Sequence, residues 1–145
     1  MPPPITHRLL HLACPARMAH LPELMALVEQ ACDEAGAGEK ARYAIRLAVE
    51  EIAVNVISYG YPDREPGPIE LTLAWDEDQM TIVIEDQAAC FAPTDAPAPD
   101  LDSSWDKRSP GGLGWYLVQA MVDTVQHRHE PANGNRYTLV KRLAS

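Results

Sequence analysis

The sequence has only three cysteines, Cys14, Cys32 and Cys90, and no two of them are closely spaced. This number and spacing argue against a disulfide framework and against a zinc site. Reduced thiols in a cytoplasmic protein are the simplest account of them, so we expect a cytoplasmic location. No apolar run is long enough to span a bilayer, and residues 1–10 contain no hydrophobic segment of a signal peptide.

Basic residues are also scarce. The chain has 12 lysines and arginines against 21 aspartates and glutamates, which gives a formal net charge of −9. This excess of negative charge argues against nucleic acids and anionic membranes as primary partners. At 145 residues the chain is long enough for a substantial core, and we predict a single domain over residues 1–145.

The hydrophobic pattern predicts both helices and strands. Helices are expected where apolar residues recur every three or four positions, and strands where they alternate. The expected elements are a strand at 5–13, helices at 21–35 and 43–57, a hairpin at 69–75 and 80–85, a helix after residues 111–114, and a hairpin at 124–129 and 136–143. Residues 87–110, rich in Pro, Asp and Ala, show no period and are expected to form a lid.

This order, β-α-α-β-β-lid-α-β-β, predicts the fold class. It is typical of an α+β protein in which one mainly antiparallel sheet carries all the helices on one face. We therefore expect a two-layer sandwich.

The second predicted helix carries two polar residues on an otherwise apolar side. Arg42, Arg46 and Glu50 form a row at i, i+4, expected to be a solvated face held by an ion pair. Glu51 is not on that row and lies directly below Asn55, where a lone carboxylate is costly to bury. In one interpretation Glu51 caps a loop and Asn55 ties down backbone. In the other, Asn55 holds Mg²⁺ and Glu51 accepts a proton from a nucleophile.

A glycine cluster, Gly111-Gly112-Leu113-Gly114, opens the third helix. Such a cluster can approach a phosphate closely and offers free N–H groups at the positive helix end. It is neither a P-loop nor a dinucleotide fingerprint, because no Lys-Ser or Lys-Thr follows and no parallel βαβ unit surrounds it. Asp86, at the end of the strand before the lid, can accept a hydrogen bond from an adenine amino group or can simply initiate a turn.

The ordered combination of these motifs is more specific than any one of them. Glu51-x-x-x-Asn55, Asp86-x-x-x-x-Phe91, the glycine cluster and a closing strand resemble the Bergerat-type (GHKL) ATPases. Within these, EEIAVNVISYGYP, GGLGWYLVQAMVD and LVKRL are similar to segments of the bacterial anti-sigma-factor serine/threonine kinases. The resemblance covers nearly the whole chain.

The resemblance implies a role for each motif. Asn55 would bind Mg²⁺ between the nucleotide phosphates, and Glu51 would accept the proton of the attacking hydroxyl group. Asp86 would recognise adenine, with Thr138 supporting it from the last strand. The implied nucleotide-binding set is Asn55, Asp86, Ala88, Gly111, Gly112, Leu113, Gly114 and Thr138.

Two features of the lid affect this expectation. Ala88 stands where the family usually has glycine, and Cys90 where proline or glycine is common. The Cβ of Ala88 is expected to lower nucleotide affinity without abolishing binding. Lys107 and Arg108 precede the glycine cluster, where a cation can meet the β- or γ-phosphate, although a solvated pair in a loop is an equal alternative.

The resemblance implies an enzyme that uses ATP and Mg²⁺ to phosphorylate a Ser or Thr of a STAS-type anti-sigma-factor antagonist, and that sequesters a sigma factor. It leaves homodimerisation open. One alternative is a nucleotide-binding partner-switching module without catalytic activity, which the departures at Ala88 and Cys90 favour. A histidine-kinase catalytic domain acting in trans is less favoured, because the sequence shows no phosphoacceptor-helix domain.

Overall fold

The computed structural model describes residues 8–61, 65–88, 112–130 and 134–144, and of Gly112 and Leu113 it describes the backbone alone. The elements are β1 (Arg8–Pro15), a 3-10 turn η1 (Met18–His20), α1 (Leu21–Ala35), α2 (Glu39–Tyr59), β2 (Pro68–Trp75), β3 (Gln79–Asp86), α3 (Gly112–Met121), β4 (Thr124–Glu130) and β5 (Gly134–Arg142). This order confirms the predicted fold class.

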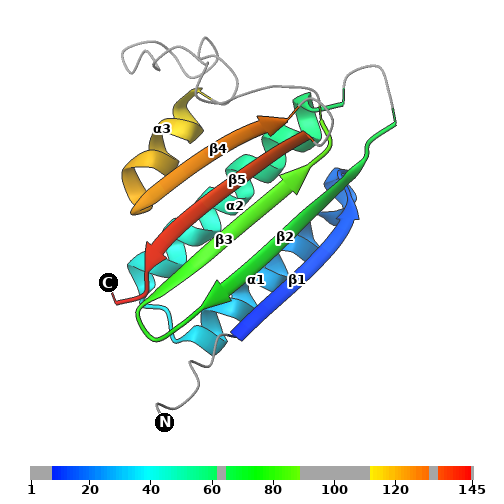
Figure 1. Cartoon of the computed structure of the whole chain (residues 1–145). Helices are drawn as coiled ribbons and strands as arrows, with labels where there is room; N and C mark the ends of the chain where they lie inside the picture. The colour runs from blue at the N-terminus through cyan, green and yellow to red at the C-terminus, as the bar shows by residue number, and fades with distance from the viewer. Residues whose placement is uncertain (1–7, 62–64, 89–111, 131–133, 145) are drawn as a thin grey trace.

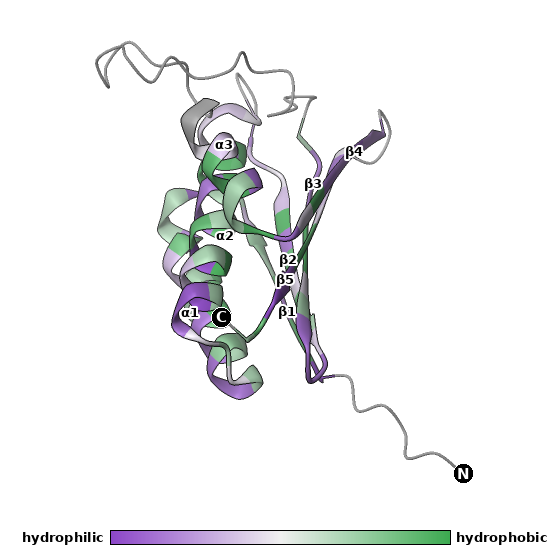
Figure 2. Ribbon diagram, turned by 90° about the vertical axis from the view of Figure 1, so that its left-hand side faces the viewer, coloured by the Kyte–Doolittle hydropathy of each residue, from purple (hydrophilic) through white to green (hydrophobic). Residues whose placement is uncertain are grey.

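The five strands form one sheet in the order β1-β2-β3-β5-β4, and every neighbouring pair is antiparallel. Figures 1 and 2 show the three helices on one face of this sheet. In the described part of the chain no helix covers the other face. Alternate side chains of each strand therefore point either to the helices or to the open face.

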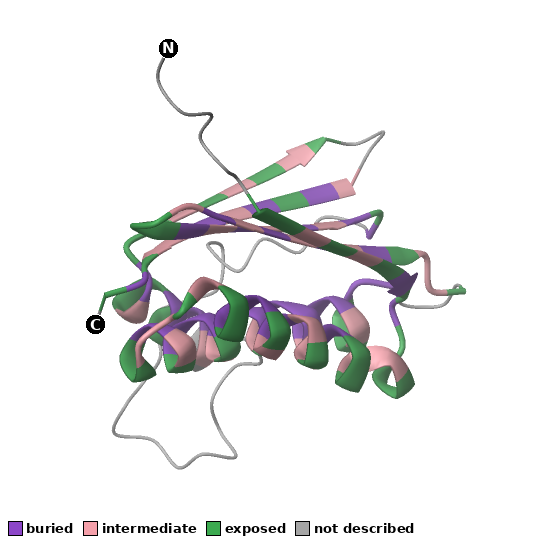
Figure 3. Cartoon of the chain, turned by 90° about the horizontal axis from the view of Figure 1, so that it is seen from below, coloured by how far each residue is buried: buried purple, intermediate pink, exposed green. Residues whose placement is uncertain are grey.

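Aliphatic side chains hold the two layers together. In β2 and β3 every second residue is buried, which is the alternation expected for a sheet covered on one side. Burying one such side chain is worth about 1.5–3 kcal/mol relative to leaving it exposed. Figure 3 shows the buried residues of the helices on the side that faces the sheet, and the alternation of buried and less buried residues along the strands. The largest fully buried side chains include Leu24, Val28, Ile45, Val49, Ile52, Leu71, Leu73, Ile82, Ile84 and Leu139.

Several boundaries differ from the sequence-based prediction. β1 continues to Pro15 instead of ending at residue 13, because an edge strand tolerates a proline. α2 begins at Glu39 rather than at residue 43, because its polar first turn hides the buried Ala41 that the helix contributes to the core. α1 ends as expected at Gly36, whose left-handed φ of 69° suits glycine.

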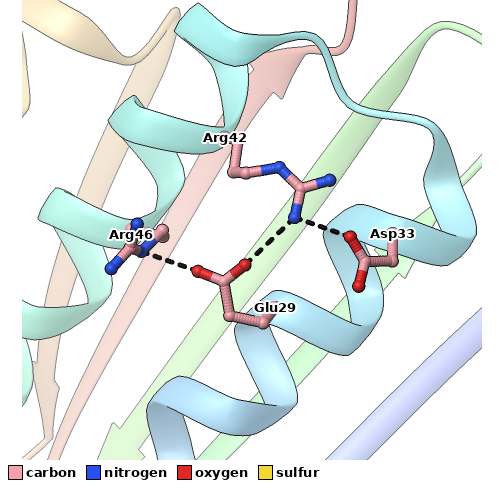
Figure 4. Close-up of polar contacts among 4 residues, drawn as sticks. All are labelled: Glu29, Asp33, Arg42 and Arg46. Carbon is pink, nitrogen blue, oxygen red and sulfur yellow. Dashed lines mark hydrogen bonds and ion pairs between the residues drawn. The ribbon is translucent and has the colours of Figure 1, made fainter.

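The expected ion pair along the face of α2 is not formed. Figure 4 shows that Arg42 and Arg46 reach across to Glu29 and Asp33 of α1. Arg42 Nη1 lies 3.0 Å from Glu29 Oε2 and 2.7 Å from Asp33 Oδ1, and Arg46 Nε lies 2.7 Å from Glu29 Oε1. The helical period predicted the shared face correctly, but it could not reveal the carboxylates that a neighbouring helix supplies.

None of the helices in the described ranges is long and apolar enough to cross a membrane.

Candidate functional site

The C-terminal half of α2 carries Glu51 and Asn55, as the sequence predicted. Asn55 is 6% exposed, and its Nδ2 donates a long hydrogen bond of 3.5 Å to Oε1 of the partly buried Glu51. Burial raises the pKa of the Glu51 carboxyl. The hydrogen bond from Asn55 offsets part of this rise, and the nearby Glu50 carboxylate adds to it. A carboxylate with a raised pKa is a better proton acceptor near neutral pH than an ordinary one.

The first turn of α3 lies against Glu51. A Cβ built at Gly114 would overlap the carboxyl group of Glu51, so only a residue without a side chain allows this approach. The structure thus brings the first and third sequence motifs into contact.

Asp86, at the end of β3, is a buried carboxylate with one unused oxygen. The residue is 3% exposed. Its Oδ1 accepts hydrogen bonds from the Ala88 backbone N–H at 2.8 Å and from Asn135 Nδ2 at 2.9 Å. Its Oδ2 is buried and has no hydrogen-bond partner among the described residues. Leaving a buried acceptor unpaired is costly, so Oδ2 marks a position where a ligand donor would be favourable.

The segment after Asp86 is anchored to the end of α2. The side chain of Ala88 is 4% exposed and faces Gly60, where an added Cβ would come within 2.8 Å of the Ala88 Cβ. The Tyr61 hydroxyl accepts a hydrogen bond from the Gln87 backbone N–H at 3.0 Å and donates one to Pro68 O at 3.3 Å. Gly60 therefore provides the space for the methyl group of Ala88, which lessens the expected penalty of this departure from the family pattern.

Asn135 is a site residue that the sequence analysis missed. Its side chain is 4% exposed and donates to Asp86. It is preceded by Gly134, which has a φ of 89° and whose Cβ, if present, would overlap the backbone carbonyl oxygen of Asp86. The apolar alternation of Tyr137 and Leu139 places Asn135 on the buried face of β5, and this signal was available in the sequence.

The prediction for Thr138 is wrong. Thr138 lies three positions from Asn135 on β5, so its side chain points to the opposite, open face of the sheet. There it lines a small hollow with Gln126, Arg128 and Arg136. Asn135, not Thr138, supports Asp86 from the last strand.

Asn55, Asp86 and Asn135 are the three buried polar or charged residues within the described ranges. Besides Asp86 Oδ2, one more buried polar atom lacks a hydrogen-bond partner among the described residues. It is Nε1 of Trp115, the residue after Gly114 in α3. The Trp115 ring packs edge-on against Tyr137, with ring centroids 6.3 Å apart. Burial of polar groups is thus concentrated where α2, α3, β3 and β5 approach one another.

Other predicted residues lie outside this cluster or outside the described residues. The backbone of Gly112 and Leu113 belongs to α3. Lys107, Arg108, Gly111, Cys90 and lid residues 89–110 lie outside the described residues. Within the described ranges no group of three or more His, Cys, Asp or Glu residues could hold a metal ion.

A hollow of about 430 Å³ lies at the ends of β2, β3 and β5. It is lined mainly by charged residues of the open sheet face, and it reaches Asp86 and Asn135. Glu51 and Asn55 do not line it. This hollow is therefore not the place where the sequence motifs meet.

Comparisons with known proteins agree with these observations. The model of the histidine kinase-like ATPase domain matches residues 14–141. The chain is 28% identical over 103 residues to the serine/threonine-protein kinase BtrW of Bordetella bronchiseptica, which covers 71% of this chain and 72% of that protein. It is 28% identical over 108 residues to the anti-sigma F factor of Clostridium novyi, with 70% and 71% covered. With the serine-protein kinase RsbW of Bacillus velezensis the identity is 29% over 87 residues, and the match spans only 54% of that relative.

Two solved structures show the same fold. The RsbU and RsbW domains of Rv1364c from Mycobacterium tuberculosis match 94% of this chain with a TM-score of 0.68 and 20% identity, although the match spans only 32% of that chain. A blue-light activated histidine kinase domain from Erythrobacter litoralis EL346 matches 84% of this chain and 60% of its own, with a TM-score of 0.55 and 16% identity. At these identities the likeness concerns the fold alone.

The resemblance to anti-sigma-factor kinases inferred from the sequence is confirmed by these relatives. Because the family model spans most of its length, the chain belongs to the family of histidine kinase-like ATPase domains.

Proposed function

We propose that this protein binds ATP and transfers its γ-phosphoryl group to a Ser or Thr of an anti-sigma-factor antagonist, and that it sequesters a sigma factor. The observation that carries the proposal is the pair of polar groups held at the contacts between motifs. Glu51 is a partly buried carboxylate beside Gly114 with a raised pKa, and one buried oxygen of Asp86 has no partner among the described residues. The names of the relatives, serine kinases and an anti-sigma F factor, support the class of partner.

The base end of the proposed site is Asp86. An adenine ring carries an exocyclic amino group with two N–H donors, and the free Oδ2 of Asp86 offers an acceptor for one of them. A buried carboxylate that already accepts two hydrogen bonds through Oδ1 is held in one orientation. The residues present therefore fit an adenine nucleotide.

The phosphate end of the proposed site is Asn55 with the first turn of α3. Because the amide nitrogen of Asn55 faces Glu51, its carbonyl oxygen points away and is available to a cation. Carbonyl and carboxylate oxygens are the protein ligands that Mg²⁺ prefers, so the donor set fits this metal. Mg²⁺ bound there would neutralise phosphate charge during phosphoryl transfer. Lys107 and Arg108 remain proposed phosphate ligands.

Glu51 is the proposed general base. It would accept the proton of the substrate hydroxyl while the hydroxyl oxygen forms a bond to the γ-phosphorus and the bond to the β–γ bridging oxygen breaks, which releases ADP. Burial favours the protonated form of Glu51 that results from this step. The contact with Gly114 would keep the carboxylate next to the helix end that approaches the phosphates.

A cytoplasmic location is part of the proposal. Cys14 and Cys32 are buried free thiols, and burial raises the pKa of the Cys32 thiol to about 11. A thiol with so high a pKa is inert at neutral pH, as expected of a core residue rather than of a redox site.

Transfer of label from γ-labelled ATP to a candidate antagonist tests the proposal. We expect Mg²⁺-dependent formation of acid-stable phosphoserine or phosphothreonine, and a loss of about 10²-fold or more in Glu51→Gln, a typical general-base effect. Glu39→Gln, which removes a charge from the exposed first turn of the same helix, is the matched control. Binding of ATP in calorimetry without any transfer would instead identify a nucleotide-binding module, and acid-labile label would indicate a histidine kinase acting in trans.

A second measurement separates metal binding from catalysis. Asn55→Ala is expected to abolish the effect of Mg²⁺ on ATP affinity in calorimetry while leaving the fold intact. A variant that binds ATP with the same Mg²⁺ dependence as the wild type would contradict the metal assignment.

A further inference from the structure

Two histidines of β4 continue the polar network behind Asp86. Asn135 Oδ1 lies 2.8 Å from His127 Nε2 and 3.2 Å from His129 Nδ1. His129 is the direct cross-strand neighbour of Asn135, and His127 pairs with Tyr137 two positions further along. The network thus runs from Asp86 on β3 through Asn135 on β5 to β4.

The chemistry of the partners determines the orientation of the Asn135 amide. Asp86 Oδ1 and the Ala88 carbonyl oxygen, 2.9 Å and 3.4 Å from Asn135 Nδ2, are both acceptors. The amide nitrogen must therefore face Asp86, and the amide oxygen must face the histidines. An amide oxygen only accepts, so His127 carries a hydrogen on Nε2 and His129 carries one on Nδ1. A flipped amide would set its oxygen against the oxygens of Asp86 and Ala88.

The His127 ring is itself held in place. It stacks on Tyr137 with a centroid distance of 4.6 Å and an interplanar angle of 24°. This contact restricts rotation of the imidazole and keeps Nε2 directed at Asn135. The orientation of the amide is therefore determined by packed neighbours rather than by solvent.

We propose that His127 and His129 are positioning residues for base recognition: they lock the amide of Asn135, so that Asp86 presents only an acceptor and the site selects 6-amino purines over 6-oxo purines. This inference rests on the proposed nucleotide binding at Asp86. An amino group at position 6 donates to the free Oδ2, whereas an oxo group there sets an acceptor against a carboxylate. Without the two histidine donors, only the contacts with Asp86 and Ala88 hold the amide of Asn135, so the Asp86 carboxylate that it orients is less restrained.

The affinities of the full chain for ATP and ITP, measured by calorimetry, test the proposal. We expect the wild type to bind ATP more tightly than ITP. In the double variant His127→Phe/His129→Leu the ratio of the two affinities should fall about tenfold, the value of one oriented hydrogen bond. Phe at 127 keeps a ring to stack on Tyr137 but removes the donor. The single variant His127→Gln has an amide N–H that can lie near the position of Nε2. It should therefore keep the wild-type preference for ATP. His11→Leu, on the open sheet face, is the control.

The outcomes separate this inference from the proposed function. If the wild type binds neither nucleotide, both are overturned. If the wild type prefers ATP and the double variant keeps the full preference, the histidine lock is wrong while nucleotide binding stands.

Nitrogen-15 spectra of the imidazoles in the nucleotide-free protein give a readout that does not depend on ligand affinity or on a variant. We expect a protonated Nε2 in His127 and a protonated Nδ1 in His129. An unprotonated nitrogen at either position would overturn the lock.

Discussion

The two halves of α2 treat their charged side chains in opposite ways. In the N-terminal half, Arg42 and Arg46 form short ion pairs with Glu29 and Asp33 of α1, and these groups remain partly exposed (Figure 4). In the C-terminal half, Glu51 forms no ion pair with a described residue and has a single long hydrogen bond, although it is more buried.

The difference separates structural from functional polarity. Charged side chains that form ion pairs beside solvent contribute little to stability and need no ligand to neutralise them. A carboxylate kept partly buried without a cation lowers stability at neutral pH, so it is expected where a substrate or a proton needs it. The contrast along one helix thus points to its C-terminal half as the part that belongs to the functional site.

The largest effect on stability is expected where α2 ends. In Gly60→Ala the new Cβ would meet Val56 O and the Cβ of Ala88, and the variant should lose about 1–3 kcal/mol of unfolding free energy, typical of overpacking. The double variant Gly60→Ala/Ala88→Gly should recover only part of this loss, because the contact with the Val56 backbone remains. Urea denaturation of the three variants measures the coupling, and strict additivity would contradict the contact.

Gly114→Ala tests the contact between α3 and Glu51. The added Cβ would displace the flexible end of Glu51, so we expect a loss of about tenfold in phosphoryl transfer, or roughly 1.4 kcal/mol in activation free energy. Stability should change little, because alanine is the better helix former. Gln119→Ala, on the exposed side of the same helix, is the control. Wild-type transfer in Gly114→Ala would show that the contact does not position Glu51.

Glu51→Gln should stabilise the protein at neutral pH while it impairs transfer. The pKa of Glu51 is raised in the folded state, so its favourable contribution is complete below its ordinary value of 4.5 and is lost as the pH rises through the raised value. Glutamine does not titrate. The stability difference between variant and wild type should therefore be small in acid and grow towards neutral pH.

Urea denaturation at several pH values between acid and neutral measures this difference. Glu77→Gln in the exposed turn before β3 is the control for removing one negative charge. A variant that is less stable than the wild type at neutral pH would show that Glu51 is held by an interaction stronger than the desolvation it suffers.

The smallest effect is expected at the other half of α2. Arg42→Met removes two ion pairs but keeps an aliphatic side chain, and it should lower the unfolding free energy by at most about 1 kcal/mol, as for other partly exposed pairs. High salt should reduce the difference, because salt screens exposed charges. Nucleotide affinity should be unchanged in calorimetry. A strong loss of affinity would remove the distinction between the two halves.

Local sequence signals predicted most of the fold and part of the site. Apolar spacing predicted the elements in their correct order, because helices and strands bury one side at different periods. The same spacing separated Glu51 from the exposed Glu50, since neighbouring positions on a helix point in different directions. Strand alternation could have identified Asn135, but the resemblance directed attention to Thr138, and an odd shift along a strand reverses the face.

The identity of the motifs, the α+β order and the position of Glu51 and Asn55 on one side of a helix were determined by the sequence alone, because each depends on residues close together in the chain. The free oxygen of Asp86, its link to Asn135, the space that Gly60 leaves for Ala88 and the pairing of Arg42 and Arg46 with α1 were decided only by the tertiary structure. Each of these joins residues from separate elements, and no local period records what a distant segment places beside a side chain. Burial is likewise a property of the packed layers, so the raised pKa of Glu51 exists only once α2 and α3 lie together.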